Sequence, residues 1–199
     1  MRVSQQTLAA HRAAILEQAG KLFRERGIDA VGVADITRAA GLTHGAFYGH
    51  FPSKTALAAE ACRTSLTEGA RHWRGRAARA RAAGRDPLAA IIDAYMTEGH
   101  RDRPEDGCAL AARGPQIARA EPPLRQALDA GISALTEVLE DEIGAQHPGL
   151  DAACAALAVL AALAGGLMVA RACADDPERS RAALRAAADL ALRAAHTEA

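Results

Sequence analysis

The 199-residue sequence predicts an all-α protein of about nine helices. Alanine, the strongest helix former, makes up about a quarter of the chain, and hydrophobic residues make up 50%. Aromatic residues are only 3%, so a large β-sheet is not expected. Proline and glycine recur where helices would begin and end. This composition excludes a disordered chain and suits one good-sized domain or two small ones that share a core.

The first two helices are predicted from apolar spacing and from glycine. One helix runs from about Ser4 to Arg26, and Gly27 is its expected stop. A short helix over Val33–Ala40 follows and ends at Gly41. The apolar face of the first helix recurs at helical spacing. It consists of Leu8, Ile15, Ala19, Leu22 and Phe23.

The next two helices are predicted from their caps. Thr43 is expected to cap a short helix over His44–Gly49. Pro52 then interrupts the chain, and Ser53 caps a long helix that reaches about Arg81.

Aspartate followed by proline marks two further helix starts, because aspartate caps a helix and proline suits its first position. Asp86-Pro87 opens a helix over 87–100, and Asp176-Pro177 opens one over 177–196. Three more helices are predicted between them, near 105–113, 122–144 and 150–173.

Residues 35–48 have the spacing of a helix-turn-helix. Ile36 faces inward from its first helix, and Gly41 permits the tight turn. Leu42 fills the turn, and Phe47 anchors the second helix in the core. The remaining side chains of the second helix then point outward near its N-terminus, the end that a recognition helix presents to the major groove.

The predicted DNA contacts follow from this geometry. Gly45 lets the backbone approach DNA closely, and Tyr48 is placed to bind a phosphate. Lys54, one of only two lysines, lies at a plausible phosphate position, whereas His50 suits packing or the phosphate side. The predicted DNA-binding residues are Arg38, Thr43, His44, Gly45, Tyr48, His50 and Lys54. His44 and His50 have no third ligand nearby, so no metal site is expected.

The charge distribution favours a nucleic-acid partner for the first part of the chain. The formal net charge is zero, with 24 basic and 24 acidic residues. Residues 1–85 hold 14 of the basic and 6 of the acidic residues, which leaves 10 basic and 18 acidic residues in 86–199. A basic segment beside an acidic one suits a polyanionic partner for the basic segment, although scattered surface charge remains an alternative.

The run from Ile15 to Leu57 resembles the TetR/AcrR family of bacterial transcriptional regulators. The resemblance is carried by Leu22-Phe23, Gly27, Asp35-Ile36, Ala40-Gly41, Gly45-Ala46-Phe47-Tyr48 and His50-Phe51-Pro52-Ser53-Lys54. It implies a three-helix DNA-binding domain over 1–52 and a helical ligand-binding and dimerisation domain over 53–199. It also implies that double-stranded operator DNA is the partner. The chain departs from the family at Gly32, where Ser or Thr usually caps the second helix.

The resemblance further implies a homodimer in which the last two helices form a four-helix bundle with a second subunit. Small-residue spacings, Ala161/Gly165 and Ala162/Gly166, would allow backbones to approach closely. A two-fold dimer would fit a palindromic operator. The predicted interface residues are Leu157, Leu160, Ala164, Leu167, Leu184, Ala188 and Ala191.

A small-molecule effector is the other partner that the resemblance implies, and its pocket is expected among the helices after the DNA-binding domain. The candidate ligand-binding residues are Trp73, Tyr95, Met96, Cys108, Arg113 and Met168. Other interpretations stay open. Trp73 suits surface cation–π packing with nearby arginines, Met168 suits core filling, and Arg113 suits a solvated helix end.

Cys108 suggests an alternative, a regulator that senses electrophiles or oxidants through a thiol. It follows Gly107 at a predicted helix start, where a thiolate is stabilised, but Glu105 and Asp106 oppose that effect. A free cysteine is also commonly a small buried hydrophobe. The four cysteines lie far apart, without zinc spacing.

Residues 152–170 carry no charge over a length close to that of a membrane span. The segment is mostly alanine and has no aromatic belt, so a helix buried among other helices is the favoured interpretation. The polar N-terminus lacks a signal peptide, and a cytoplasmic location is expected.

The sequence thus predicts a homodimeric repressor that a small molecule releases from a palindromic operator. No catalytic pair, phosphate loop or nucleotide fingerprint is present, so neither an enzyme nor a cofactor is expected. The remaining alternative is a small-molecule-binding protein whose DNA-binding half is vestigial.

Overall fold

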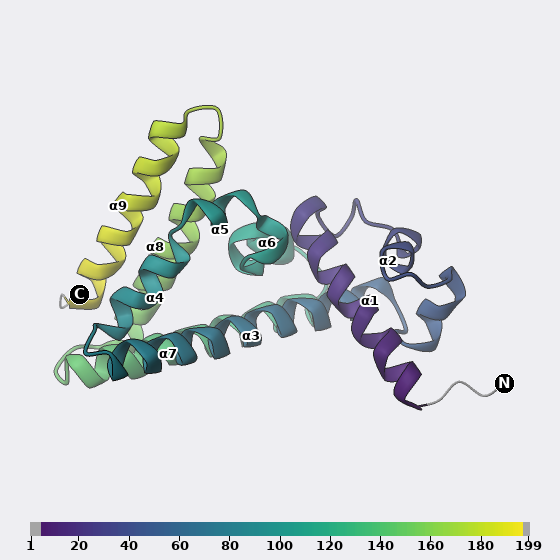
Figure 1. Ribbon diagram of the computed structural model, residues 1–199, viewed down its shortest axis with the longest axis horizontal. Coiled ribbons are helices and arrows are strands. Elements are labelled where there is room, and N and C mark those ends of the chain that lie inside the picture. The colour runs from purple at the N-terminus through teal and green to yellow at the C-terminus, as the bar shows by residue number, and fades with distance from the viewer. Residues whose placement is uncertain (1–4, 197–199) are drawn as a thin grey trace. The chain divides into compact units, whose positions relative to one another are not determined.

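A computed structural model describes residues 5–196 and confirms the all-α prediction (Figure 1). Within this range nine α-helices and two short 3₁₀ helices follow one another without a strand. Their bounds are α1 Gln5–Arg26, α2 Val33–Ala39, η1 His44–Gly49, α3 Lys54–Ala82, α4 Pro87–Tyr95, α5 Glu98–Asp102, η2 Pro104–Asp106, α6 Ala109–Ile117, α7 Pro122–Gln146, α8 Ala152–Ala172 and α9 Pro177–His196. Ser4, the predicted start of the first helix, lies outside the described range.

Two predicted helices differ from the structure. The helix expected over 87–100 is two helices, because α4 ends at Tyr95 and the hydroxyl of Thr97 caps α5 by accepting the N–H of His100 at 3.1 Å. The helix expected over 105–113 begins four residues later, with Cys108 as its N-cap. The cap at Thr97 accounts for the start of α5, whereas Cys108 makes no side-chain capping bond at the start of α6.

The chain divides into two compact units. Unit 1 comprises Met1–Ser65 and Pro104–Ala130, and unit 2 comprises Leu66–Arg103 and Gly131–Ala199. Helices α3 and α7 each run from one unit into the other. The predicted domain boundary, between 52 and 53, differs from the boundaries of these two units. The division into domains 1–52 and 53–199 therefore stays a proposal.

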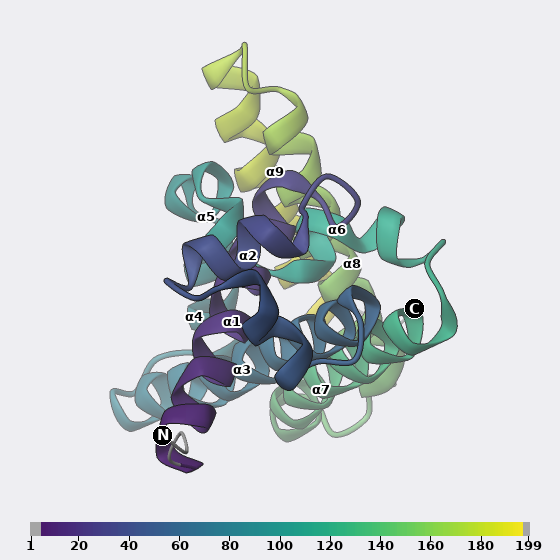
Figure 2. The same ribbon diagram turned by 90° about the vertical axis from the view of Figure 1, so that its right-hand side faces the viewer.

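The core of unit 1 joins α1, α2 and η1, and Figure 2 looks onto the side that carries α1 and α2. Ile15, Ile36 and Phe47, one from each helix, are fully buried. Gly27 and Gly41 adopt positive φ angles of 93° and 69°, as expected for a helix stop and a helix-turn-helix turn. Of the predicted apolar face of α1, Leu8 is exposed and Leu22 is half-buried.

In unit 2, α8 packs along α9, and α4 and α5 contact this pair (Figure 1). Val159, Leu163 and Leu167 of α8 are fully buried. By length and composition, α8 is the one helix in the described part of the chain that could cross a membrane. One face of α8 packs against α9, but another face is exposed, so the prediction of a helix buried on all sides is only partly met within the single chain.

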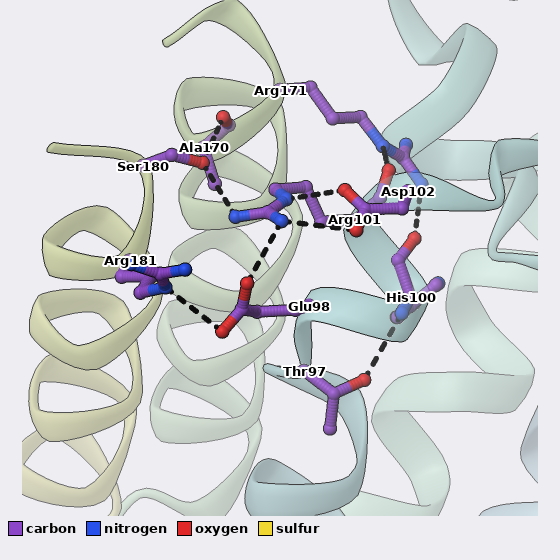
Figure 3. A network of polar contacts seen from close by, with 9 residues as sticks. All are labelled: Thr97, Glu98, His100, Arg101, Asp102, Ala170, Arg171, Ser180 and Arg181. Atoms are coloured by element: carbon purple, nitrogen blue, oxygen red, sulfur yellow. Dashed lines mark hydrogen bonds and ion pairs between the residues drawn. The ribbon is translucent and has the colours of Figure 1, made fainter. Parts of the chain in front are cut away.

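A polar network fixes α5 to the ends of α8 and α9 (Figure 3). Arg101 donates to the hydroxyl of Ser180 at 3.0 Å and to the Glu98 carboxylate at 3.1 Å. Arg181 of α9 donates to the same carboxylate at 3.1 Å. Arg171 of α8 donates to the carbonyl oxygens of Arg101 and His100 at 3.1 and 2.8 Å. The two bonds from Arg171 satisfy carbonyls that the end of the short helix α5 leaves without a helical partner.

His100 makes the stability of this region depend on pH. Burial lowers the pKa of His100, and the nearby Arg171 cation lowers it further. The carbonyl oxygen of Tyr95, which accepts from Nδ1 at 2.8 Å, raises this pKa and offsets part of the decrease. A histidine with a lowered folded pKa binds fewer protons when folded, so its contribution is present above its unfolded pKa of about 6.5 and is lost as pH falls. We therefore expect the free energy of unfolding to decrease from pH 7 to pH 5.

Urea denaturation at both pH values measures this effect. His100→Gln should reduce the pH dependence, whereas His72→Gln, which alters an exposed histidine on α3, should leave it nearly unchanged. Equal pH dependence in the His100→Gln protein and the unmodified protein would contradict the assignment.

Candidate nucleic-acid interface and adjoining pocket

Helix η1 presents a set of exposed side chains over a buried anchor. Phe47 has no exposed surface and packs against Phe51, with ring centroids 5.9 Å apart. On the opposite side, Thr43 and His44 are exposed, and Tyr48 exposes 63% of its surface. The His44 and Tyr48 rings meet edge-on, with centroids 5.9 Å apart. The structure thus brings these predicted DNA-binding residues together on one exposed side of η1.

The protein's own packing does not account for glycine at position 45. Gly45 is exposed, its φ is not positive, and a Cβ built on it would meet no atom within 4 Å. A glycine within a helix costs about 1 kcal/mol relative to alanine. Thr43, the N-cap, makes no capping bond through its side chain. Gly45 leaves room for a partner at this surface, and the Thr43 hydroxyl is not used in capping η1.

The other predicted DNA-binding residues have contacts within unit 1. The exposed Arg38 pairs with Asp35 at 3.3 Å, and the half-buried His50 meets His11 edge-on at 6.2 Å between centroids. Lys54 donates to the carbonyl oxygens of Ile28 and Val31 at 3.0 and 3.2 Å. The structure therefore gives Lys54 a role inside the protein, joining the start of α3 to the loop between α1 and α2.

The missing hydroxyl cap at Gly32 is partly replaced. The carboxylate of Asp35 accepts the backbone N–H of Gly32 at 3.1 Å. This is the return bond of a capping box, so α2 keeps one of its two usual N-terminal side-chain bonds.

A small pocket, partly open to solvent, lies within unit 1 between α1, the first part of α3 and α6. It is lined by Gly20, Phe23, Arg24, Ile28, Ala58, Ala61, Cys62, Ala109, Arg113 and Ile117. Arg113 closes one side by donating to the carbonyl oxygens of Phe23 and Glu25 at 3.0 and 2.6 Å. Arg24 likewise donates to the carbonyl oxygen of Glu105.

The six predicted ligand-binding residues do not share one site in the structure. Arg113 lines the pocket of unit 1, and Cys108 caps α6 nearby. Trp73 and Tyr95 pack edge-on in unit 2, with centroids 5.8 Å apart. Met96 also lies in unit 2, and Met168 exposes 40% of its surface there. Sequence analysis missed the lining residues of α1 and α3, which gave no signal beyond helical apolar spacing.

The predicted dimer residues lie mostly inside the protein. Five of them are buried within unit 2: Leu160, Ala164, Leu167, Leu184 and Ala191. Ala188 is half-buried, and Leu157 exposes 56% of its surface. A different set of α8 residues forms an exposed stripe without charge, here called the α8 stripe. It comprises Cys154, Leu157, Ala158, Ala161, Met168 and Val169.

Across residues 5–196, His, Cys, Asp and Glu form no group of three or more that could hold a metal ion. Four free cysteines are present, of which Cys62 is buried and Cys154 exposed.

Comparisons with known proteins show similarity to regulators of transcription, first in the sequence of the helix-turn-helix region. The model of the family described as bacterial regulatory proteins, tetR family, matches residues 15–61. The helix-turn-helix transcriptional repressor KstR2 of Rhodococcus jostii (strain RHA1) is 40% identical over 60 residues, which are 30% of this chain. The match spans only 29% of that repressor's length.

Solved structures extend the similarity over nearly the whole chain. A TetR transcriptional regulator from Chloroflexus aurantiacus J-10-FL is 26% identical with a TM-score of 0.72, covering 93% of this chain and 96% of its own. The transcriptional regulator FadR from Bacillus subtilis, solved in complex with stearoyl-CoA, is 16% identical with a TM-score of 0.69. That alignment covers 92% of this chain and 98% of FadR. At this identity FadR shows only a shared fold.

Proposed function

We propose that this chain, whose residues 15–61 match the tetR family and whose fold is similar to a solved TetR regulator, is a homodimeric repressor released from operator DNA by a small molecule. The observation that carries the proposal is the exposed end of η1. Thr43, His44 and Tyr48 point outward there, while the buried Phe47 fixes the helix in the core. A rigid scaffold with polar groups exposed along one side of a short helix is an arrangement that can contact DNA in the major groove.

A smaller basic surplus lies near η1. Residues 1–65 hold 8 basic and 5 acidic residues, whereas the other six basic residues of 1–85 lie in unit 2. Basic residues near η1 would attract DNA phosphates. Arg38 is exposed on α2, the helix that precedes η1 in the sequence. Its guanidinium is suited to a phosphate contact.

The proposed dimer uses the α8 stripe. This stripe carries no charge although it is exposed, and exposed apolar patches on soluble proteins commonly mark interfaces. A two-fold interface of this kind would set two copies of η1 against two half-sites of a palindrome.

The proposed effector is a small molecule, and the proposed location is the cytoplasm. The similar fold of FadR, which was solved with stearoyl-CoA, supports a ligand-responsive regulator. The family and the similar structures are regulators of transcription, which supports a function other than catalysis. Thiol sensing through Cys108 stays an untested alternative.

Selection of bound DNA from a random-sequence pool, at two salt concentrations, tests the function. We expect a palindromic consensus. Tyr48→Ala should lower affinity for this consensus by about 10- to 150-fold, because one hydrogen bond to a charged phosphate contributes about 1.5–3 kcal/mol. Arg185→Ala, which removes an exposed charge on α9, serves as the control and should leave affinity unchanged.

Binding without any consensus, lost steeply as salt rises, would show that the basic segment only holds phosphates. That outcome would contradict the proposed regulator. A consensus without two-fold symmetry would contradict the dimer alone.

A further inference from the structure

Two histidines from distant parts of the chain meet in unit 2. His147 directly follows α7, and His196 is the last residue of α9. Nε2 of His147 lies 2.6 Å from Nδ1 of His196, and the ring centroids are 4.6 Å apart at an interplanar angle of 83°. The two residues are 49 positions apart, so no local spacing marks them as a pair.

The backbones of both residues are held in place by the fold. The N–H of His147 donates to the carbonyl oxygen of Ile143 at 2.8 Å, and its own carbonyl oxygen accepts from the N–H of Leu150 at 3.1 Å. Ile143 and Ala195, the residue before His196, have no exposed surface. The meeting of the two rings therefore follows from the packing of unit 2.

This contact brings two metal-binding atoms to one point. A neutral imidazole has one N–H and one lone pair, so one ring donates its proton to the lone pair of the other. Imidazole nitrogen suits Ni²⁺, Cu²⁺ and Zn²⁺ as a ligand. His147 is half-buried and His196 is exposed, so an ion has access to the pair from solvent.

The distance between the two nitrogens is close to the distance that one ion requires. Metal–nitrogen bonds of about 2.0–2.1 Å that meet at roughly 90–110° place their nitrogens roughly 2.8–3.4 Å apart. The observed 2.6 Å is slightly shorter. A small rotation of the rings, which the exposed His196 can make, turns both lone pairs toward a common ion.

We propose that Nε2 of His147 and Nδ1 of His196 bind one divalent transition-metal ion of the class that prefers imidazole, with water in its remaining positions. Within residues 5–196, no Cys, Asp or Glu completes a group of three with the two histidines. The ion takes the place of the shared proton, which moves to the outer nitrogen of the ring that carries it. Both rings then bind as neutral imidazoles.

Such an ion would stabilise the folded chain. Only folding brings together two ligands that are 49 residues apart, so the ion prefers the folded chain to the unfolded chain. This preference raises the free energy of unfolding. Both histidines belong to unit 2 and η1 belongs to unit 1, so the site is separate from the proposed DNA contacts.

Calorimetric titration of the full-length protein, prepared without a histidine tag, tests the site with Ni²⁺. We expect one ion per chain with a dissociation constant below about 1 mM. Mg²⁺, which prefers oxygen ligands, should not bind measurably. His147→Gln and His196→Gln should each weaken Ni²⁺ binding by about tenfold or more. The two variants test the pair independently, and circular dichroism checks that each remains folded.

Two variants serve as matched controls for other groups that bind Ni²⁺. His72→Gln removes an exposed histidine of α3, and Cys154→Ser removes the exposed thiol of α8. Both should bind Ni²⁺ like the unmodified protein. Absence of saturable Ni²⁺ binding would overturn the proposal, as would unchanged affinity in the folded His196→Gln protein.

Urea denaturation measures the expected stabilisation. Saturating Ni²⁺ should raise the denaturation midpoint of the unmodified protein and of the His72→Gln protein, and should leave that of the His196→Gln protein unchanged. An unchanged midpoint in the unmodified protein, with Ni²⁺ bound, would show that the ion binds the unfolded chain equally well. That result would overturn a site that folding assembles.

Discussion

Replacing Phe47 with alanine is expected to lower the free energy of unfolding by about 3–5 kcal/mol. The ring of Phe47 is fully buried between the helices of unit 1 and lies 5.2 Å from Tyr48 and 5.9 Å from Phe51, between centroids. Its removal leaves a cavity beneath η1. Because whole domains are stable by only about 5–15 kcal/mol, sequence-specific DNA binding should be lost as well. Urea denaturation and DNA-binding titrations measure the two effects.

Tyr48→Ala is the matched control, since it removes the neighbouring aromatic ring from an exposed position. It should change the free energy of unfolding by less than about 0.5 kcal/mol while weakening DNA binding. If both variants were equally stable, Phe47 would not be the anchor of η1.

Replacing Gly166 with alanine is expected to destabilise unit 2 by about 1–3 kcal/mol. A Cβ at this position would lie 2.1 Å from the Cβ of Ala187 and 2.9 Å from Cε of Met96. Met96 can move aside, but the Ala187 Cβ is fixed to the backbone of α9, so α8 and α9 must separate. This cost exceeds the gain of about 1 kcal/mol in helix propensity. Thermal and urea unfolding, the latter followed by Trp73 fluorescence in unit 2, measure the change.

Gly165→Ala provides the comparison at the adjacent position. No atom lies within 4 Å of a Cβ built there, so the substitution should stabilise the helix by about 0.5–1 kcal/mol. Equal stability of the two variants would contradict the close approach of α8 to α9.

The helix-turn-helix could be predicted from the sequence because its information is local. Gly41 and Phe47 act through a turn and one buried ring, within a few residues of each other. The predicted bounds of 44–49 agree with η1, although η1 is a 3₁₀ helix. Short helices commonly take this tighter form.

The sequence could not identify the buried face of α8. Nearly every position of this helix is small or apolar, so its spacing distinguishes no single face. Leu160 and Leu167, which are predicted to meet a second subunit, are already buried within the single chain. The small-residue approach predicted at Gly166 occurs, but its partner is Ala187 of the same chain.

By itself, the sequence determined the all-α fold, the two Asp-Pro helix starts and the outward residues of η1, because caps, turns and local spacing act over a few residues. The tertiary structure alone decided which contacts form between distant segments. Arg113 reaches the carbonyl oxygen of Phe23, 90 residues earlier, and Lys54 is held by the loop after α1. No local pattern encodes such pairs. The pocket of unit 1 exists only because packing brings three helices together.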